Sequence, residues 1–307
     1  MRGLSGFFKT ALIIPVFFFL LTPSYGAGTV TGDFLLVNVS ARETALGGVY
    51  AANYAKPGAS TANPAVLYGI RKQHVLFSHY SSVFGTYYEQ LIYATPIGKR
   101  SAIAGQFLFS TTAGLHITDE NGNPVGGEVD NYDALIGAVY SLEISKGFSF
   151  GVNMKIITSK ILDNANWGAA INLGLLYRNF DNRYMIGVSV ENLGLSVYYF
   201  TDGLMYPLFL RAGYATEVYR YESSYQISVY IEERIAVNEE QGAETSFGLE
   251  AVYENFFVFR YGYIFGREEG RVSVGAGIRL KQFDIDYAFQ PFFVSDNVHR
   301  ITLELVF

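Results

Sequence analysis

Few side chains in this sequence have the type and spacing that chemistry requires. The segment from Gly187 to Glu191 approaches the Gly-x-Ser-x-Gly motif of serine hydrolases, but Glu191 stands where the second glycine belongs. The histidines are far apart and match no metal-binding spacing; they are His74, His79, His116 and His299. The sequence therefore offers no catalytic residue and no metal ligand, and we expect a protein that is not an enzyme and has no cofactor.

One segment imitates a calcium-binding loop. Asp119, Asn121 and Asn123 have the spacing of the first ligands, and Asp130 occupies the twelfth position. Pro124, however, stands where such a loop needs glycine for its sharp turn. We interpret the segment as a turn at a loop tip.

Composition narrows the class of protein. The chain has no cysteine, which excludes disulfides, thiolate metal sites and a lipoprotein anchor, and its net charge of -6 gives no reason to expect nucleic acid as a partner. Half of the residues are hydrophobic and 16% are charged, with 24 Tyr and 25 Phe. A mean hydropathy of +0.18 suits strands with one apolar face, and aromatic rings suit membrane interfaces. An aromatic-rich soluble β-sandwich is the alternative.

The N-terminus predicts export. Arg2 and Lys9 precede an apolar run from residue 11 to 21, and small residues then lead to Gly26. The run is shorter than the roughly 20 residues of a spanning helix, so we expect a signal peptide over residues 1 to 26, cleaved after Gly26. Removing its two basic residues changes the charge from -6 to -8.

Period-two alternation dominates the chain from residue 71 to 307 and predicts strands. Between residues 148 and 156, apolar side chains alternate with Ser149, Gly151, Asn153 and Lys155. Similar segments begin near 72, 86, 101, 129, 147, 166, 183, 205, 221, 243, 255, 271, 282 and 298. Long connections follow odd-numbered segments and short ones follow even-numbered segments, as in outer-membrane barrels with long external loops. We expect an all-β protein, a transmembrane antiparallel barrel of about 14 strands.

Residues 27 to 70 differ, because they are rich in alanine and glycine and cannot line a lipid face. They predict a segment of loops and short helices that either hangs in the periplasm or folds back into the barrel as a plug. The compact, weakly charged composition favours the plug.

The alternation also sends charged side chains toward the lumen. One interpretation is that they pair across strands, stiffen the wall and hold the plug; the other is that they form a solute path or a site that recognises a carboxylate. These lumen-facing residues are Arg178, Glu191, Arg211, Glu232, Glu250, Arg260, Arg279, Asp284, Asp286 and Glu304.

Several motifs resemble the PorV/PorQ family of outer-membrane proteins. ARETALGGVYAA (41 to 52) and ANPAVL (62 to 67) resemble the start of that family, and INLGLLYR, VENLG, LFLRAGYA, FGLEAVYENFFVFRYGY, IDYAF and HRITLELVF follow in order. The resemblance runs from about residue 34 to 307. It implies a fourteen-stranded barrel of the bacterial outer membrane, related to the FadL-like long-chain fatty-acid transporters.

The sequence is compatible with two functions. The first is binding or transport of a hydrophobic small molecule, for which an aromatic loop is the best support: Tyr198, Tyr199, Phe200, Tyr206 and Phe209. The second, which the resemblance allows, is a non-enzymatic accessory of protein export by the type IX secretion system, with secretion-system proteins as partners. Outer-membrane lipid and the barrel-assembly machinery are expected partners of either.

The final residues generate a first prediction. Ile301, Leu303, Leu305 and Phe307 form the apolar face of the last strand, and a terminal aromatic resembles the signal that the barrel-assembly machinery recognises. We expect deletion of Phe307 to lower the amount of folded protein in the outer membrane sharply, as measured by immunoblotting of membrane fractions. Unchanged insertion would refute this role of Phe307.

Overall fold

The computed structural model describes residues 32 to 307 except 83–84, 180, 182, 195–196, 200–201, 223, 239–241 and 293–295. The predicted signal peptide and its cleavage site lie outside the described residues. Among the described residues, no helix is long and apolar enough to span a membrane.

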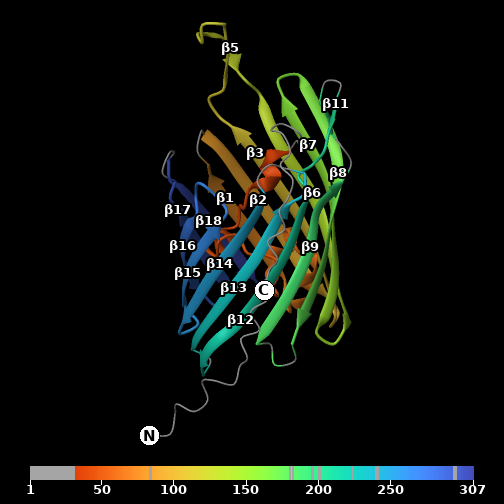
Figure 1. Cartoon of the computed structure of the whole chain (residues 1–307), viewed down its shortest axis with the longest axis vertical. Helices are drawn as coiled ribbons and strands as arrows, with labels where there is room; N and C mark the ends of the chain where they lie inside the picture. Colours follow the sequence, from red (N-terminus) through yellow and green to blue (C-terminus); the bar gives the residue numbers. More distant parts are fainter. Residues whose placement is uncertain are drawn as a thin grey trace.

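In the described part of the chain, fourteen antiparallel strands form a closed barrel (Figure 1). Each strand pairs with the next barrel strand in the sequence, and the last pairs with the first to close the wall. The strands are β1 (His74–Ser81), β2 (Thr86–Ile97), β3 (Ser101–Thr112), β6 (Asn131–Ser145), β7 (Phe148–Ile161), β8 (Asn164–Arg178), β9 (Tyr184–Gly194), β12 (Phe209–Tyr221), β13 (Tyr225–Ala236), β14 (Ala243–Tyr253), β15 (Phe257–Phe265), β16 (Val272–Arg279), β17 (Phe283–Gln290) and β18 (Val298–Val306).

The predicted fold class is confirmed. The expected strand starts lie within four residues of the observed ones, and those at 86, 101, 243 and 298 coincide with them. Short turns connect the strands at one end of the barrel. Two of the longer connections at the other end contain small hairpins, β4 (His116–Thr118) with β5 (Pro124–Glu128) and β10 (Val197–Tyr199) with β11 (Asp202–Leu204). The β4–β5 hairpin extends beyond the rest of the barrel (Figure 1).

Side chains alternate between an apolar exterior and a polar interior, as β7 illustrates. Ser149 and Asn153 are fully buried, whereas Met154 on the outer face is 59% exposed. An apolar outer surface of this kind is stable when hydrocarbon surrounds it. The period-two pattern therefore reports the two faces of the wall.

The segment from residue 33 to 69 occupies the lumen (Figure 1). It contains α1 (Ala41–Ala45) and three 3-10 helices, η1 (Asp33–Leu36), η2 (Gly58–Thr61) and η3 (Pro64–Gly69). The α1 helix packs on β15 to β18, and η3 packs on β3, β6, β7 and β8. Leu67 of η3 and Ile70, the residue after η3, form an apolar layer with inward-facing residues of β1, β2, β3 and β6. We call residues 33 to 69 the plug; the predicted limits of 27 and 70 stay a prediction.

Glycines on the inner wall allow the plug backbone to approach closely. A Cβ at Gly187 would overlap the carbonyl oxygen of Ala51, and one at Gly151 would overlap the backbone at Pro64 and Ala65. A missing side chain therefore creates the space for the plug at these positions. Glycines that face the plug in this way are Gly151, Gly174, Gly187, Gly213, Gly248, Gly262 and Gly275, on β7, β8, β9, β12, β14, β15 and β16.

These glycines generate a second prediction. We expect Gly187→Val to destabilise the barrel by about 1–3 kcal/mol or more, because the new side chain must displace backbone rather than a flexible side chain. The measurement is the temperature at which the folded form is lost in heat-modifiability gels. The matched control is Gly105→Val on the outer face of β3, where an added Cβ meets no atom within 4 Å. Equal melting of both variants would contradict the prediction.

Candidate functional site

A cavity lies between the plug and the wall. Its volume is about 60 Å³, several times the roughly 10–15 Å³ that one water molecule needs. The plug contributes Phe34, Leu35, Val37, Asn38, Tyr50, Thr61 and Ala62 to its lining. The wall contributes Gln90, Gln106, Phe107, Leu108, Leu135, Lys155, Glu191, Asn192 and Arg211.

One side of the cavity is apolar. Phe34 of η1 packs in a buried cluster with Leu108 of β3 and Leu135 of β6, and Leu35 and Val37 pack against that cluster. Such a surface favours contact with an apolar group, because the contact releases water from the lining and from the group. This side is suited to a small apolar group.

The other side is polar and not fully satisfied. Gln90 on β2 is buried, and its Oε1 atom has no hydrogen-bond partner among the described residues. Lys155 on β7 donates to Asn192 Oδ1 at 2.7 Å but forms no salt bridge in the described part of the chain. A buried acceptor and a buried cation without a carboxylate partner are both costly. A ligand with a polar group could satisfy either of them.

A β-bulge explains why two successive residues of β9 reach this cavity. The pairing of β8 with β9 shifts register between Ile171 and Leu173, and Asn192 has a positive φ of 60°. The side chain of Asn172 accepts a hydrogen bond from the backbone N–H of Asn192 at 2.7 Å. Consequently both Glu191 and Asn192 are buried, whereas regular alternation would send one of them outward.

Glu232 and Arg211 attach the plug to the wall beside the cavity. Glu232 Oε2 accepts hydrogen bonds from the backbone N–H groups of Tyr50 and Ala51 at 2.7 and 2.6 Å. Its other oxygen accepts from Arg211, which also pairs with Glu191 and donates to the carbonyl of Gly48. Arg211 and Tyr50 therefore both line the cavity and belong to the contact that holds the plug.

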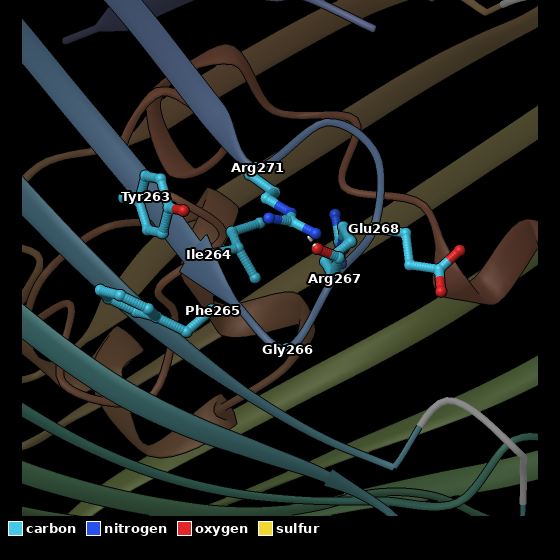
Figure 2. A pocket seen from close by; sticks show the side chains of 7 residues that line it. All are labelled: Tyr263, Ile264, Phe265, Gly266, Arg267, Glu268 and Arg271. Carbon is cyan, nitrogen blue, oxygen red and sulfur yellow. Dashed lines mark hydrogen bonds between the residues drawn. The ribbon is translucent and has the colours of Figure 1, made fainter. Parts of the chain in front are cut away.

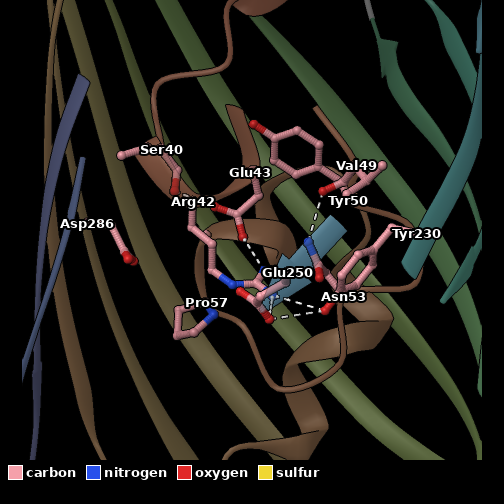
Figure 3. A network of polar contacts seen from close by, with 12 residues as sticks. Ser40, Arg42, Glu43, Val49, Tyr50, Asn53, Pro57, Tyr230, Glu250 and Asp286 are labelled. Carbon is pink, nitrogen blue, oxygen red and sulfur yellow. Dashed lines mark hydrogen bonds and ion pairs between the residues drawn. The ribbon is translucent and has the colours of Figure 1, made fainter. Parts of the chain in front are cut away.

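A second buried network holds α1 (Figure 3). Arg42 of α1 lies 3.2 Å from Glu250 on β14 and 3.3 Å from Glu43. Glu250 also pairs with Arg260 at 2.7 Å, and Arg260 reaches Asp286 at 2.6 Å across the intervening strand. Each of these charges has an opposite partner, which offsets the cost of removing it from water.

The predicted lumen-facing charges thus lie on the inner wall but have different surroundings. Glu191, Arg211, Glu232, Glu250, Arg260 and Asp286 are buried in the two networks. Arg178 donates to the hydroxyl of Tyr68 in the plug at 3.2 Å, and burial raises the pKa of Tyr68 to about 12. Arg279 and Asp284 are half-buried near the short-turn end. Glu191 and Arg211 are the members of the set that reach the cavity.

Of the predicted aromatic loop, the structure describes the side-chain surroundings of Tyr206 and Phe209. Tyr206 packs in the cluster that contains Phe34, and Phe209 lies under the guanidinium of Arg234 at 4.5 Å. Neither lines the cavity. Tyr198 and Tyr199 belong to β10, and Phe200 lies outside the described residues.

A separate hollow lies at the loop between β15 and β16 (Figure 2). It has a volume of about 220 Å³ and is lined by Tyr263, Ile264, Phe265, Gly266, Arg267, Glu268 and Arg271. Arg267 is already engaged by both oxygens of Glu244 at 2.8 Å. Because this hollow is formed by one hairpin, we do not regard it as the main site.

Residues of the calcium-loop-like segment and several of the histidines have hydrogen-bond partners within the protein. Asp119 accepts hydrogen bonds from the backbone of Asn121 and Asn123, and the bonds from Asn123 hold the pKa of Asp119 below its usual range. His74 bonds to Glu304 and His299 to Tyr287. Among the described residues, no group of three acidic or histidine side chains could hold a metal ion.

Comparison with known proteins supports the fold. No protein-family model and no curated protein sequence matches the chain. Among solved structures, the chain is similar to the toluene transporter TodX of Pseudomonas putida, with a TM-score of 0.61, 11% identity, and 86% of this chain and 97% of that one covered. It is also similar to the toluene transporter TbuX of Ralstonia pickettii (0.57, 14%, 87% and 98%) and a FadL homologue of Pseudomonas aeruginosa (0.55, 10%, 92% and 99%).

Sequence reasoning missed the polar side of the cavity. The alternation over residues 148 to 156 already placed Lys155 on the inner face, but nothing local distinguished it from Ser149 or Asn153. Gln90 and Gln106 lie on the consecutive strands β2 and β3, whereas Asn192 lies on β9, far away in the sequence, so their meeting depends on the register of the sheet. Phe34 depends on the path of the plug.

The plug contact generates a third prediction. We expect Glu232→Gln to weaken the attachment of the plug by about 2 kcal/mol, because hydrogen bonds to a charged acceptor become bonds to a neutral one. The measurement is the rate at which a maleimide labels the cysteine of Ala52→Cys. Ala52 is buried in the plug, and the chain has no other cysteine that could react. The rate should rise roughly thirtyfold, since each 1.4 kcal/mol corresponds to a factor of ten in the opening equilibrium. Glu254→Gln in an exposed turn is the control, and equal rates in both would disprove the attachment.

Proposed function

We propose that this protein is an integral barrel of the bacterial outer membrane that binds or transports a hydrophobic solute. The main support for this proposal is the cavity between the plug and the wall, one side of which is apolar. The wall itself is closed and has an apolar exterior. The solute enters from the end with the long loops and shifts the plug, because the cavity of about 60 Å³ is smaller than the roughly 150 Å³ that holds benzene. Its apolar part then packs against Phe34, Leu108 and Leu135.

The proposed orientation follows from the loops. The end with long connections faces outward and the short turns face the periplasm, as is usual in such barrels. Export by the predicted signal peptide, cleaved after Gly26, and insertion by the barrel-assembly machinery belong to the same proposal. No step requires catalysis or a cofactor.

The proposal extends to the family. The motifs quoted above support membership of the PorV/PorQ type, with FadL-like solute handling. The solved structures named as toluene transporters are consistent with a hydrophobic solute, but the identity of the solute here is proposed only as a class.

One observation supports the second candidate function, an accessory of type IX secretion that binds partner proteins. The β4–β5 hairpin carries Leu115, Ile117 and Val125 with exposed side chains beyond the barrel. Exposed aliphatic side chains in this position suit contact with another protein. Deleting residues 115 to 128 should abolish co-purification of partners under this hypothesis and leave solute binding intact under the first.

The cavity generates a fourth prediction. We expect Leu135→Trp to fill the cavity and reduce binding of a neutral hydrophobic naphthylamine dye about tenfold, measured by fluorescence titration in detergent. The control is Ile136→Trp, because Ile136 is the next residue and is 65% exposed on the outer face, whereas Leu135 is 4% exposed. Equal dye binding by the two variants and the wild type would place the solute site elsewhere.

A further inference from the structure

Basic side chains gather on one sector of the short-turn end. Lys72 precedes β1, Lys99 and Arg100 form the turn between β2 and β3, Lys146 lies between β6 and β7, and Lys281 lies between β16 and β17. All five are exposed. Glu143 of β6, opposite the inward-facing Ser149 in the sheet, is an acidic neighbour of this group and lies 3.6 Å from Arg100. We call these five residues the basic rim.

The basic rim is continuous around the wall. Its turns belong to strands that follow one another in the barrel order β16, β17, β18, β1, β2, β3, β6 and β7. Backbone hydrogen bonds connect adjacent parts, from Val306 to Gln282, from Gln73 to Phe307 and from Glu143 to Arg100, at 2.7 to 2.9 Å. The cations therefore share one arc of the rim although they are far apart in the sequence.

The opposite arc has a different charge. Its turns follow β8, β12 and β14 and carry two basic residues, Arg183 and Arg220, among the residues that the structure describes there. Arg220 pairs with Glu217. The acidic residues of this arc are Asp181, Glu217, Glu222 and Glu254. The charge is thus distributed unequally around a single end of the barrel.

Apolar neighbours place the basic rim at the boundary of the hydrocarbon. Ile97 and Ile144 lie two residues before Lys99 and Lys146, and Lys281 lies between Leu280 and Phe283. With Phe307, these apolar side chains are between 46% and 54% exposed on the outer face. Cations directly beside a lipid-facing side chain lie at the level of lipid phosphates, which lysine and arginine reach with flexible stems.

We propose that the basic rim binds the headgroups of anionic phospholipids, such as phosphatidylglycerol or cardiolipin, in the inner leaflet of the outer membrane. The inference rests on the membrane location and orientation proposed above, but not on the solute. A phosphodiester between two neighbouring turns contacts cations from both, while its acyl chains pack on Ile97, Ile144 or Phe283. An acidic soluble protein would not need the adjoining apolar residues.

The test uses the full-length protein in nanodiscs of phosphatidylcholine with a minor fraction of phosphatidylglycerol. After extraction into mild detergent, native mass spectrometry measures the ratio of the two lipids retained. We expect phosphatidylglycerol to be enriched on wild type, and Lys99→Gln with Lys281→Gln to reduce that enrichment at least fivefold, since each cation near the membrane surface adds to the attraction for anionic headgroups. Lys72→Gln with Lys146→Gln should act alike.

The matched control is Arg183→Gln with Arg220→Gln on the opposite arc, which removes the same charge and should leave the enrichment unchanged. Equal loss in all double variants, or no enrichment on wild type, would overturn the proposal. Loss of an acidic periplasmic protein from pull-downs without a change in lipid ratio would also overturn it, in favour of a protein partner. Binding of the naphthylamine dye is measured on the same samples. A variant that loses lipid enrichment but still binds the dye shows that the two proposals succeed or fail independently.

Discussion

Pairing of β1 with β18 is the interaction on which the rest of the structure depends. It runs from His74 with Val306 to Ser81 with His299 and leaves the sheet without an open edge. A backbone surrounded by hydrocarbon has no water to satisfy its polar groups, so a sheet can exist there only when it closes. With fourteen strands, closure then sets the circumference of the barrel and the width of the lumen.

A wall of this size encloses more space than its own side chains fill. The plug occupies that space, and the inner wall is adapted to it in two ways. Glycines such as Gly187 remove side chains where the plug backbone passes, and carboxylates such as Glu232 accept the N–H groups that the plug exposes there. Close packing and paired charges thus act at the same level of the barrel.

The cavity is found where this fit is incomplete. Beside the sector in which glycines meet the plug, Gln90 and Lys155 face a space bounded by Phe34 and Leu135. The bulge at Asn192 adds a further polar group to the same space. Because Arg211 lines the cavity and also contacts the plug, the proposed solute site and the attachment of the plug are physically adjacent.

The sequence by itself determined the wall: alternation is a local property, so the strands, their inward residues and the closed fold class could be predicted, including Arg211 and Glu250 as lumenal charges. Tertiary structure decided which inward side chains meet. Lys155 and Asn192 become partners through the register of the sheet, Glu232 bonds to the plug 181 residues away, and Tyr206 packs outside the cavity. These contacts depend on strand register and on the path of the plug, and neither leaves a periodic trace in the sequence.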